Sequence, residues 1–231
     1  GDRVAAVLEA GRLPGAPGQD ARGLDELVRP ATAERGVFSP ILVVRPVPRE
    51  REVSLVSGKA CAEGLRDGGH EVVEYDVKRD LRALVDFLRP AGGGGPDVVF
   101  NALHGRYGED GCIQGVLEIM RVPYTHSGVL ASAIAMDKPL ARHIFASLGL
   151  RVAEGRVIER RSLASGDPMP RPYVVKPIDQ GSSIGVHIVR DGDNLAAVEA
   201  AEAAFGDRLL IEKFVPGREL TVAVMGDKPI A

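Results

Sequence analysis

From residue 41 onward, the hydrophobic positions switch repeatedly between strand-like and helix-like spacing. Residues 41–44 form an apolar, strand-like run, and residues 72–77 and 97–103 are also expected to be strands. Between them, residues 57–66 and 81–88 repeat apolar positions every three or four residues, the period of a helix. This alternation predicts an α/β region with a parallel sheet, helices on its faces and a ligand crevice at the carboxyl ends of the strands.

A different rhythm follows a predicted long helix over residues 129–148, which Gly149 would end. Short strands are expected at residues 152–158, 173–176, 186–189, 209–215 and 220–225, with one helix at 194–204. Strands that are not interleaved with helices favour an α+β region with antiparallel pairing. We therefore divide the chain into an α/β domain over residues 41–150 and an α+β region over residues 151–231. Residues 1–40, rich in Gly and Pro in part, are interpreted as a poorly ordered or foreign extension.

Composition narrows the class of partner. The chain has 231 residues, 45% hydrophobic and 26% charged, with a formal net charge of −3. This balance argues against a nucleic acid or an anionic membrane as the main partner, and no apolar run approaches the roughly 20 residues of a membrane span. Cys61 and Cys112 stand far apart without metal-ligand spacing, which fits a reducing cytoplasm. A small ligand is expected.

Candidate chemistry begins at Lys176, which ends an apolar strand and precedes a loop bracketed by Gly181 and Gly185. An ammonium group at this position attracts anions, and a glycine-rich loop can bring backbone N–H groups close to a phosphate. The pattern therefore predicts a polyphosphate clamp. The alternative is ordinary turn chemistry, because Gly and Ser are common in turns after strands.

Five motifs in order extend this pattern. They are Asn-Ala-Leu-His-Gly-Arg-Tyr-Gly-Glu-Asp-Gly at 101–111, Met-Asp-Lys at 136–138, Val-Lys-Pro at 175–177, Gly-Ser-Ser-Ile-Gly at 181–185, and Ile-Glu-Lys at 211–213 with Glu219. Together they resemble the D-alanine–D-alanine ligase family, ATP-grasp carboxylate–amine ligases of cell-wall synthesis, over roughly residues 50–231. The resemblance implies that the α+β region is the first part of an incomplete ATP-grasp region.

The resemblance implies ATP-dependent ligation of two D-alanine molecules through an acyl phosphate, for peptidoglycan precursors in the cytoplasm. It also implies ATP and Mg²⁺ or Mn²⁺ as cofactors, and a homodimer in the full-length enzyme. Two alternatives stay open. One is a sibling D-alanine–D-lactate or D-alanine–D-serine ligase, and the other is a nucleotide-binding fragment without catalysis.

The resemblance also assigns roles on the phosphate side of the nucleotide. Lys138 and Lys176 would neutralise the phosphates. Ser182 and Ser183 would form the flap over them, with Ser182 also part of a catalytic hydrogen-bonded relay. The alternatives are a surface lysine and a solvated hairpin turn.

On the adenosine side, the resemblance places Glu212 near the exocyclic amine of adenine and Glu219 on the ribose hydroxyls. A strand directs the side chains of Glu212 and Lys213 to opposite faces, so the backbone of Lys213 and Val215 is expected to read adenine. A solvated strand edge is the alternative.

The first D-alanine would be positioned by Glu50 and His104. Glu50 is expected to pair with its ammonium group and His104 to lie near its carboxylate. For Arg106, Glu109 and Asp110, a salt-bridged loop is at least as good an interpretation as ligand contact.

The chain departs from the family pattern at two places. Residues 45–48 read Arg-Pro-Val-Pro where the family has a glycine turn, so the residues before Glu50 could derive from a shifted reading frame, which the gene's nucleotide sequence would decide. The family's metal ligands would lie beyond Ala231, so no metal-binding residue is assigned. We expect residues 1–231 alone to be inactive.

Overall fold

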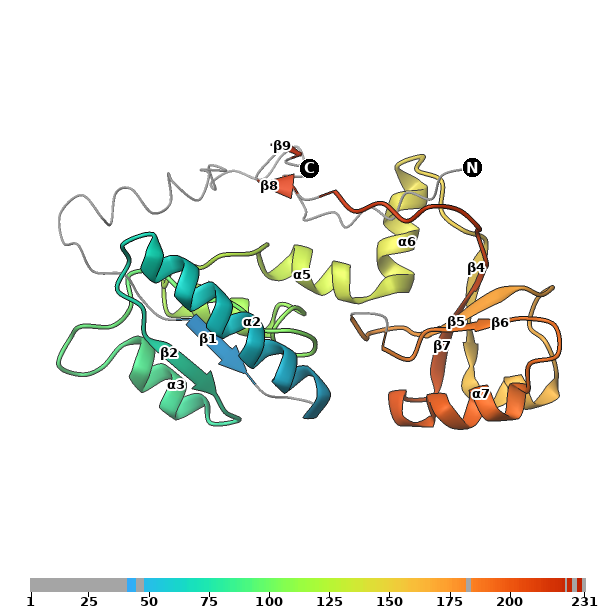
Figure 1. Cartoon of the computed structure of the whole chain (residues 1–231), viewed down its shortest axis with the longest axis horizontal. Coiled ribbons are helices and arrows are strands. Elements are labelled where there is room, and N and C mark those ends of the chain that lie inside the picture. The colour runs from blue at the N-terminus through green and yellow to red at the C-terminus, as the bar shows by residue number, and fades with distance from the viewer. Residues whose placement is uncertain (1–40, 45–47, 182–183, 223, 226–227, 230–231) are drawn as a thin grey trace. The chain divides into compact units, whose positions relative to one another are not determined.

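A computed structural model describes residues 41–44, 48–181, 184–222, 224–225 and 228–229, and the expected amino-terminal extension lies outside them (Figure 1). The described residues form two compact units. The first holds the described residues up to Ala133 together with those from Val222 onward, and the second holds residues 134–221. The domain boundary predicted near Arg151 stays a prediction.

The first unit is built on a parallel sheet with strand order β2-β1-β3. Its strands are β1 (Ile41–Val44), β2 (Glu74–Val77) and β3 (Phe100–Asn101), and its helices are α2 (Pro48–Asp67), α3 (Leu81–Leu88) and α4 (Cys112–Ile119). Ile41 pairs with Glu74 on one side and with Phe100 on the other. The predicted β-α-β unit is therefore confirmed, although β2 and β3 are shorter than the predicted strands and α2 begins nine residues earlier than residue 57.

Helices cover both faces of this sheet. Val99 and Leu103 pack in one core with residues of α3 and α4, whereas Phe100 and Ala102 pack with residues of α2. Residues that alternate along an extended segment point to opposite faces, so the segment around β3 contributes apolar side chains to two cores at once. This two-sided burial is the physical reason why Val99, Phe100, Ala102 and Leu103 are all apolar.

The helix predicted over residues 129–148 is two helices, so that prediction was wrong. α5 (Val129–Met136) ends before Asp137, and α6 (Lys138–Ser147) begins after it. Asp137 has extended backbone angles, and its carboxylate accepts a hydrogen bond from the backbone N–H of Leu140 at 2.9 Å. An N-cap followed by Pro139 in the first turn starts a new helix, and apolar periodicity alone did not reveal the break.

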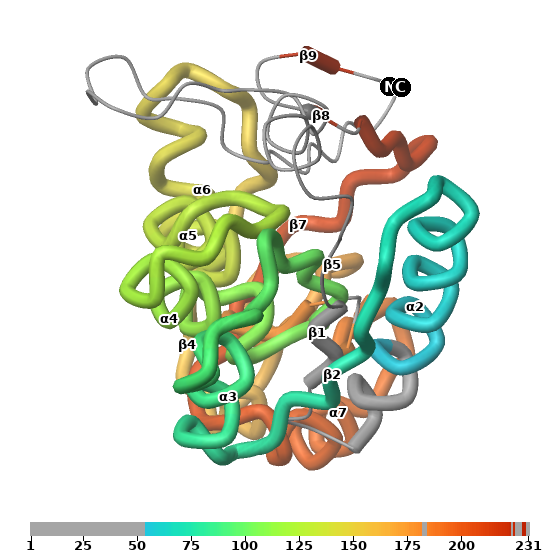
Figure 2. Tube along the Cα trace, turned by 90° about the vertical axis from the view of Figure 1, so that its left-hand side faces the viewer, coloured from blue at the N-terminus to red at the C-terminus, as the bar shows by residue number. Residues whose placement is uncertain are grey.

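The second unit holds an antiparallel sheet with strand order β4-β7-β5-β6. The strands are β4 (Gly155–Glu159), β5 (Tyr173–Pro177), β6 (His187–Val189) and β7 (Arg208–Lys213). Helix α7 (Leu195–Glu202) and the 3-10 helices η1 (Arg160–Ser165) and η2 (Ala203–Phe205) complete the unit. β7 runs between β4 and β5 (Figure 1, Figure 2). The predicted antiparallel α+β arrangement is confirmed.

The strand predicted at residues 220–225 was too long. Among the described residues of that range, the strand is limited to β8 (Val224–Met225), which pairs with β9 (Lys228–Pro229). Two-residue strands give few ladder hydrogen bonds, and Pro229 removes a donor from this short ladder. Among the described residues, no helix combines the length and the apolar character that crossing a membrane requires.

A buried carboxylate sits at the end of α7. The side chain of Glu202 is fully buried, and its Oε1 lies 3.0 Å from Nε2 of His187 on β6. Burial raises the pKa of Glu202 from 4.5 to about 7, because the charged form loses its hydration. The folded state therefore holds this proton over a pH range in which the unfolded chain has released it.

We expect this proton to make stability pH-dependent. A raised carboxyl pKa favours the folded state below pH 4.5, and that contribution is lost as the pH rises to about 7. Relative to Glu202→Gln, the free energy of unfolding of the unchanged chain should fall by up to about 3 kcal/mol across this range. Urea unfolding at several pH values measures it, with His187→Gln as a control for the neighbouring ring. Parallel stability curves for the two chains would contradict the expectation.

Candidate functional site

One face of the antiparallel sheet carries a pair of opposite charges. Lys176 on β5 stands opposite Leu210, and Glu212 on β7 stands opposite Val174, so the two charged residues are diagonal neighbours on the same face. The Nζ of Lys176 forms an ion pair with Oε2 of Glu212. The other face packs on α7 and η1 through an apolar core that includes Tyr173 and the residues around it. The sheet thus separates its core from a charged surface.

Helix α6 brings two more cations to this region. Lys138 and Arg142 are four residues apart, so they lie on the same side of the helix. The backbone N–H of Lys138 donates to the carbonyl of Ile178 at 3.0 Å, and its Nζ donates to the carbonyl of Gln180. Arg142 forms an ion pair with Glu212. Arg142 and Lys176 therefore share the carboxylate of Glu212, and Lys138 lies close enough to feel the charges of Lys176 and Glu212.

The lysine from α6 has an altered proton affinity. Burial lowers the pKa of Lys138, and the ammonium group of Lys176 lowers it further. The carboxylates of Asp179 and Glu212 act in the opposite direction. A lysine whose charge is destabilised by burial and by a second cation is stabilised by an arriving anion. The site is thus electrostatically suited to a phosphate group.

The loop after β5 is closed by its glycines. The backbone N–H of Ile184 donates to the carbonyl of Gly181 at 3.1 Å. Gly185 has a φ of +68°, and a Cβ there would lie 2.7 Å from the ring of Pro177, so only glycine fits. The predicted flap residues Ser182 and Ser183 lie outside the described residues, and their roles stay predictions.

The predicted adenosine residues follow along β7 and the segment after it. Lys213 pairs with Tyr173 and Glu212 with Val174, which puts the two side chains on opposite faces of the sheet, as expected from the strand period. Val215 and Glu219 come after the strand, and both are exposed. In the structure, Glu212 forms ion pairs with Lys176 and Arg142, which the sequence did not indicate.

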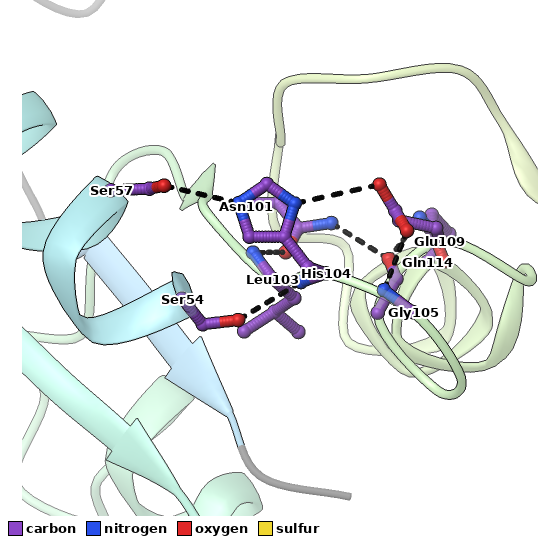
Figure 3. A network of polar contacts seen from close by, with 9 residues as sticks. Ser54, Ser57, Asn101, Leu103, His104, Gly105, Glu109 and Gln114 are labelled. Carbon is purple, nitrogen blue, oxygen red and sulfur yellow. Dashed lines mark hydrogen bonds and ion pairs between the residues drawn. The ribbon is translucent and has the colours of Figure 1, made fainter. Parts of the chain in front are cut away.

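In the first unit, His104 lies in the loop after β3, where its backbone and both ring nitrogens have partners (Figure 3). Its backbone N–H donates to Oγ of Ser54 at 3.1 Å, and its Nε2 lies 3.2 Å from Oγ of Ser57, both on α2. Its Nδ1 lies 3.7 Å from Oε1 of Glu109. Glu109 also accepts a hydrogen bond from the backbone N–H of Gly105 at 2.5 Å. The imidazole is thus oriented by the chain itself.

Two buried amides fix the middle of this loop (Figure 3). Nδ2 of Asn101 donates to the carbonyl of Gly108 at 3.0 Å, and Oδ1 of Asn101 accepts from the backbone N–H of Leu103 at 3.2 Å. Nε2 of Gln114 donates to the same Gly108 carbonyl at 2.9 Å. Loop and helix α4 are thereby tied to the end of β3.

The acidic residues of the loop have structural partners. Asp110 accepts hydrogen bonds from the backbone N–H groups of Tyr107 at 2.9 Å and Cys112 at 3.0 Å, at the start of α4. With the contacts of Glu109, this supports the interpretation of both residues as loop structure. Arg106 lies 5.3 Å from the centroid of the Tyr107 ring, a cation–π distance.

A pocket of about 340 Å³ opens at the carboxyl ends of β2 and β3, the edge where a crevice was expected. Its wall is mainly apolar, with Arg79 and Tyr107 among the polar lining residues.

Glu50 lies in the first turn of α2, and its side chain is outside the described part of the chain. Its role as a substrate contact stays a prediction.

The comparisons with known proteins agree with these motifs. The family "D-ala D-ala ligase N-terminus" matches residues 88–127, and "D-ala D-ala ligase C-terminus" matches residues 146–231. The chain is 53% identical over 184 residues to a D-alanine–D-alanine ligase of Granulibacter bethesdensis, covering 80% of this chain and 59% of that protein. It is 56% identical over 182 residues to the ligase of Gluconobacter oxydans, covering 79% and 59%. The chain thus spans about three fifths of the length of these relatives.

Solved structures give the same result. The D-alanine–D-alanine ligase of Bacillus anthracis matches with a TM-score of 0.65 and 28% identity, over 78% of this chain and 58% of that one. The same enzyme complexed with ATP matches with a TM-score of 0.63 over 80% and 58%. These solved ligases have the ATP-grasp fold, and the parallel α/β region followed by an antiparallel sheet matches this class. Within that class, the chain belongs to the D-alanine–D-alanine ligase family.

The expected divalent metal does not fit the residues that the structure describes. Among them, no three His, Cys, Asp or Glu side chains are grouped so that they could hold a metal ion. Mg²⁺ prefers several oxygen ligands in octahedral geometry, and Glu212 is already occupied by two cations. We therefore assign no step of a reaction to a metal held by these residues.

Proposed function

We propose that this chain carries the nucleotide-binding and first-substrate residues of an enzyme that joins two D-alanine molecules at the expense of ATP. A carboxylate is a poor electrophile, so its phosphorylation to an acyl phosphate precedes attack by the second amino acid's amine. The product would serve peptidoglycan synthesis. Because the reaction consumes ATP, we place it in the cytoplasm.

The observation that carries the proposal is the gathering of Lys138 and Lys176 beside Glu212 on one face of the antiparallel sheet. The two ammonium groups would neutralise the phosphates of ATP, and positive charge fixed in advance lowers the barrier to phosphoryl transfer. Ser182 and Ser183 would cover the phosphates through their backbone N–H groups. Glu212 and Glu219 would accept hydrogen bonds from the adenine amine and the ribose.

The first D-alanine is assigned to the other unit. His104 would lie near the substrate carboxylate, and its ring is already oriented by Ser57 and Glu109. Glu50 would pair with the substrate ammonium group. Both residues would act by positioning, which converts a reaction between separate molecules into one between groups already aligned. As in the expectation for the full-length enzyme, we propose a homodimer.

The chemistry of the described residues also favours a second candidate, nucleotide binding without catalysis. The described part of the chain supplies cations for phosphates but no grouped metal ligands. Phosphoryl transfer from ATP depends on metal ions that bridge the phosphates, so residues 1–231 are expected to bind ATP and to turn it over very slowly.

Two measurements test both candidates. Isothermal titration calorimetry of residues 1–231 with ATP is expected to show stoichiometric binding, and its absence would refute the nucleotide site. Phosphate release with ATP, Mg²⁺ and D-alanine is expected to stay near background. Rapid release that D-alanine supports and L-alanine does not would establish the ligase and exclude the purely binding alternative. D-serine and D-lactate as second substrates would then separate the sibling ligases.

A further inference from the structure

Arg142 is placed at the nucleotide site, although no sequence motif pointed to it. It lies one helical turn after Lys138 on α6, and its side chain is 18% exposed. Its Nη1 forms an ion pair with Oε1 of Glu212, and its Nη2 donates to the carbonyl of Ala153 at 2.6 Å. One guanidinium thus links α6 to β7 and to the segment before β4.

Glu212 is shared between two cations, one on each oxygen. Lys176 takes Oε2, and Arg142 takes Oε1. The residue is only 8% exposed, so water cannot replace a lost partner effectively. A buried carboxylate that loses all its partners is strongly destabilising, whereas one retained charge-assisted hydrogen bond prevents most of that loss.

This sharing matters because Lys176 has two tasks under the proposed function. In the structure, the carboxylate of Glu212 already neutralises its charge. To reach a phosphate, its ammonium group must leave Glu212. The carboxylate would then be buried and unpaired unless another cation stays in place. Arg142 is held from two directions and has a planar fork that can keep the carboxylate while Lys176 moves.

We propose that Arg142 is a positioning residue that keeps Glu212 paired while Lys176 moves from this carboxylate to the phosphates of a bound nucleotide. The exchange also frees Oε2 of Glu212 to accept a hydrogen bond from the adenine amine. The inference rests on the proposed nucleotide site and deepens it, because it assigns the charge that makes the lysine available. Arg142 itself touches neither the nucleotide nor the reacting atoms.

Titration calorimetry with ADP, without metal, on the 231-residue chain tests the proposal. In Arg142→Gln, Lys176 is the remaining partner of Glu212 in this cluster, so ADP should bind about 10-fold more weakly. Arg142→Lys restores a cation and should bind within about 3-fold of the unchanged chain. Thermal unfolding of each variant confirms that it is folded.

Arg160→Gln is a matched control. Arg160 is also largely buried in the second unit, where it forms ion pairs with Glu199 and Asp207. Its loss should lower the melting temperature but change ADP affinity by less than about 2-fold. If Arg160→Gln and Arg142→Gln weaken binding equally, the effect is general destabilisation and the proposal is overturned.

A double-mutant cycle with Glu212→Gln separates positioning from packing. A neutral amide does not retain Lys176, so Arg142→Gln should cost less than about 2-fold in that background. An equal cost in both backgrounds would mean that the contact with Ala153 matters, and would overturn the proposal.

Nuclear magnetic resonance follows the exchange of partners directly. On ADP saturation, the side-chain ammonium signal of Lys176 should shift, while the slowly exchanging guanidinium signal of Arg142 persists. Loss of the Arg142 signal with an unmoved Lys176 signal would refute the exchange even if a variant is unstable. If the unchanged chain does not bind ADP at all, the nucleotide site and this inference are both refuted. If it binds ADP but the effects of Arg142→Gln and Glu212→Gln on affinity simply add, the inference alone is refuted.

Discussion

Replacing Lys176 with Met is expected to weaken ATP binding by about 100-fold, the effect of losing one strong charge-assisted hydrogen bond to phosphate. Met preserves most of the aliphatic volume, and Glu212 keeps Arg142 as its partner, so the sheet should stay folded. Titration calorimetry with ATP measures the affinity, and circular dichroism checks the fold.

Lys213→Met is the matched control, since this lysine lies on the neighbouring strand and its side chain is on the opposite face from Glu212. If adenine is read by the backbone of Lys213, this variant should bind ATP within about 2-fold of the unchanged chain. Equal losses for the two variants would show that neither lysine has a specific place at the phosphates. Tight binding by Lys176→Met would remove it from the site altogether.

Replacing Tyr173 with Ala is expected to lower the free energy of unfolding of the second unit by about 3–5 kcal/mol. Tyr173 is completely buried and packs in the core on the face of the sheet away from Lys176. Removing the ring leaves a cavity that β5 and β7 cannot close without distorting their pairing. Urea unfolding followed by far-ultraviolet circular dichroism measures the loss.

Tyr173→Phe is the companion variant, because it keeps the ring and removes only the hydroxyl. That hydroxyl donates to Oδ1 of Asp167 at 2.8 Å, which also accepts from Arg171 at 2.8 Å. The expected loss is about 1 kcal/mol, since Asp167 retains its charged partner. A loss as large as that of Tyr173→Ala would assign the stability to the hydrogen bond and contradict the cavity argument.

The sheets were predictable from the sequence where burial imposes a simple period. The mainly apolar segments at residues 41–44 and 173–176 were recognisable as strands, and β1 and β5 form there, while two-sided burial explains why apolar residues dominate around β3. The break between α5 and α6 was missed because the apolar periodicity continues through Asp137, although this residue ends one helix and caps the start of the next. Local capping chemistry is invisible to a pattern of hydrophobic positions.

The site residues that belong to recognisable motifs could be predicted from the sequence, whereas Arg142, which connects α6 to Glu212, could not. Lys138, Lys176 and Glu212 were expected, and they lie together. Arg142 was missed, although its position four residues after Lys138 on a helix was the available signal. Its partner Glu212 is 70 residues away in the sequence, and the two residues come into contact only when the chain folds.

The hydrogen bonds of Asn101 and Gln114 to Gly108 have an entropic consequence for the loop after β3, which contains His104. A loop that orders only when its ligand arrives subtracts the lost conformational freedom from the binding free energy. Here the chain gives up that freedom during folding, because the buried amides hold the loop through hydrogen bonds within the chain itself. A small amino acid makes few contacts with a protein. Because the loop is preorganised, little of the binding free energy from these contacts is lost to ordering the loop.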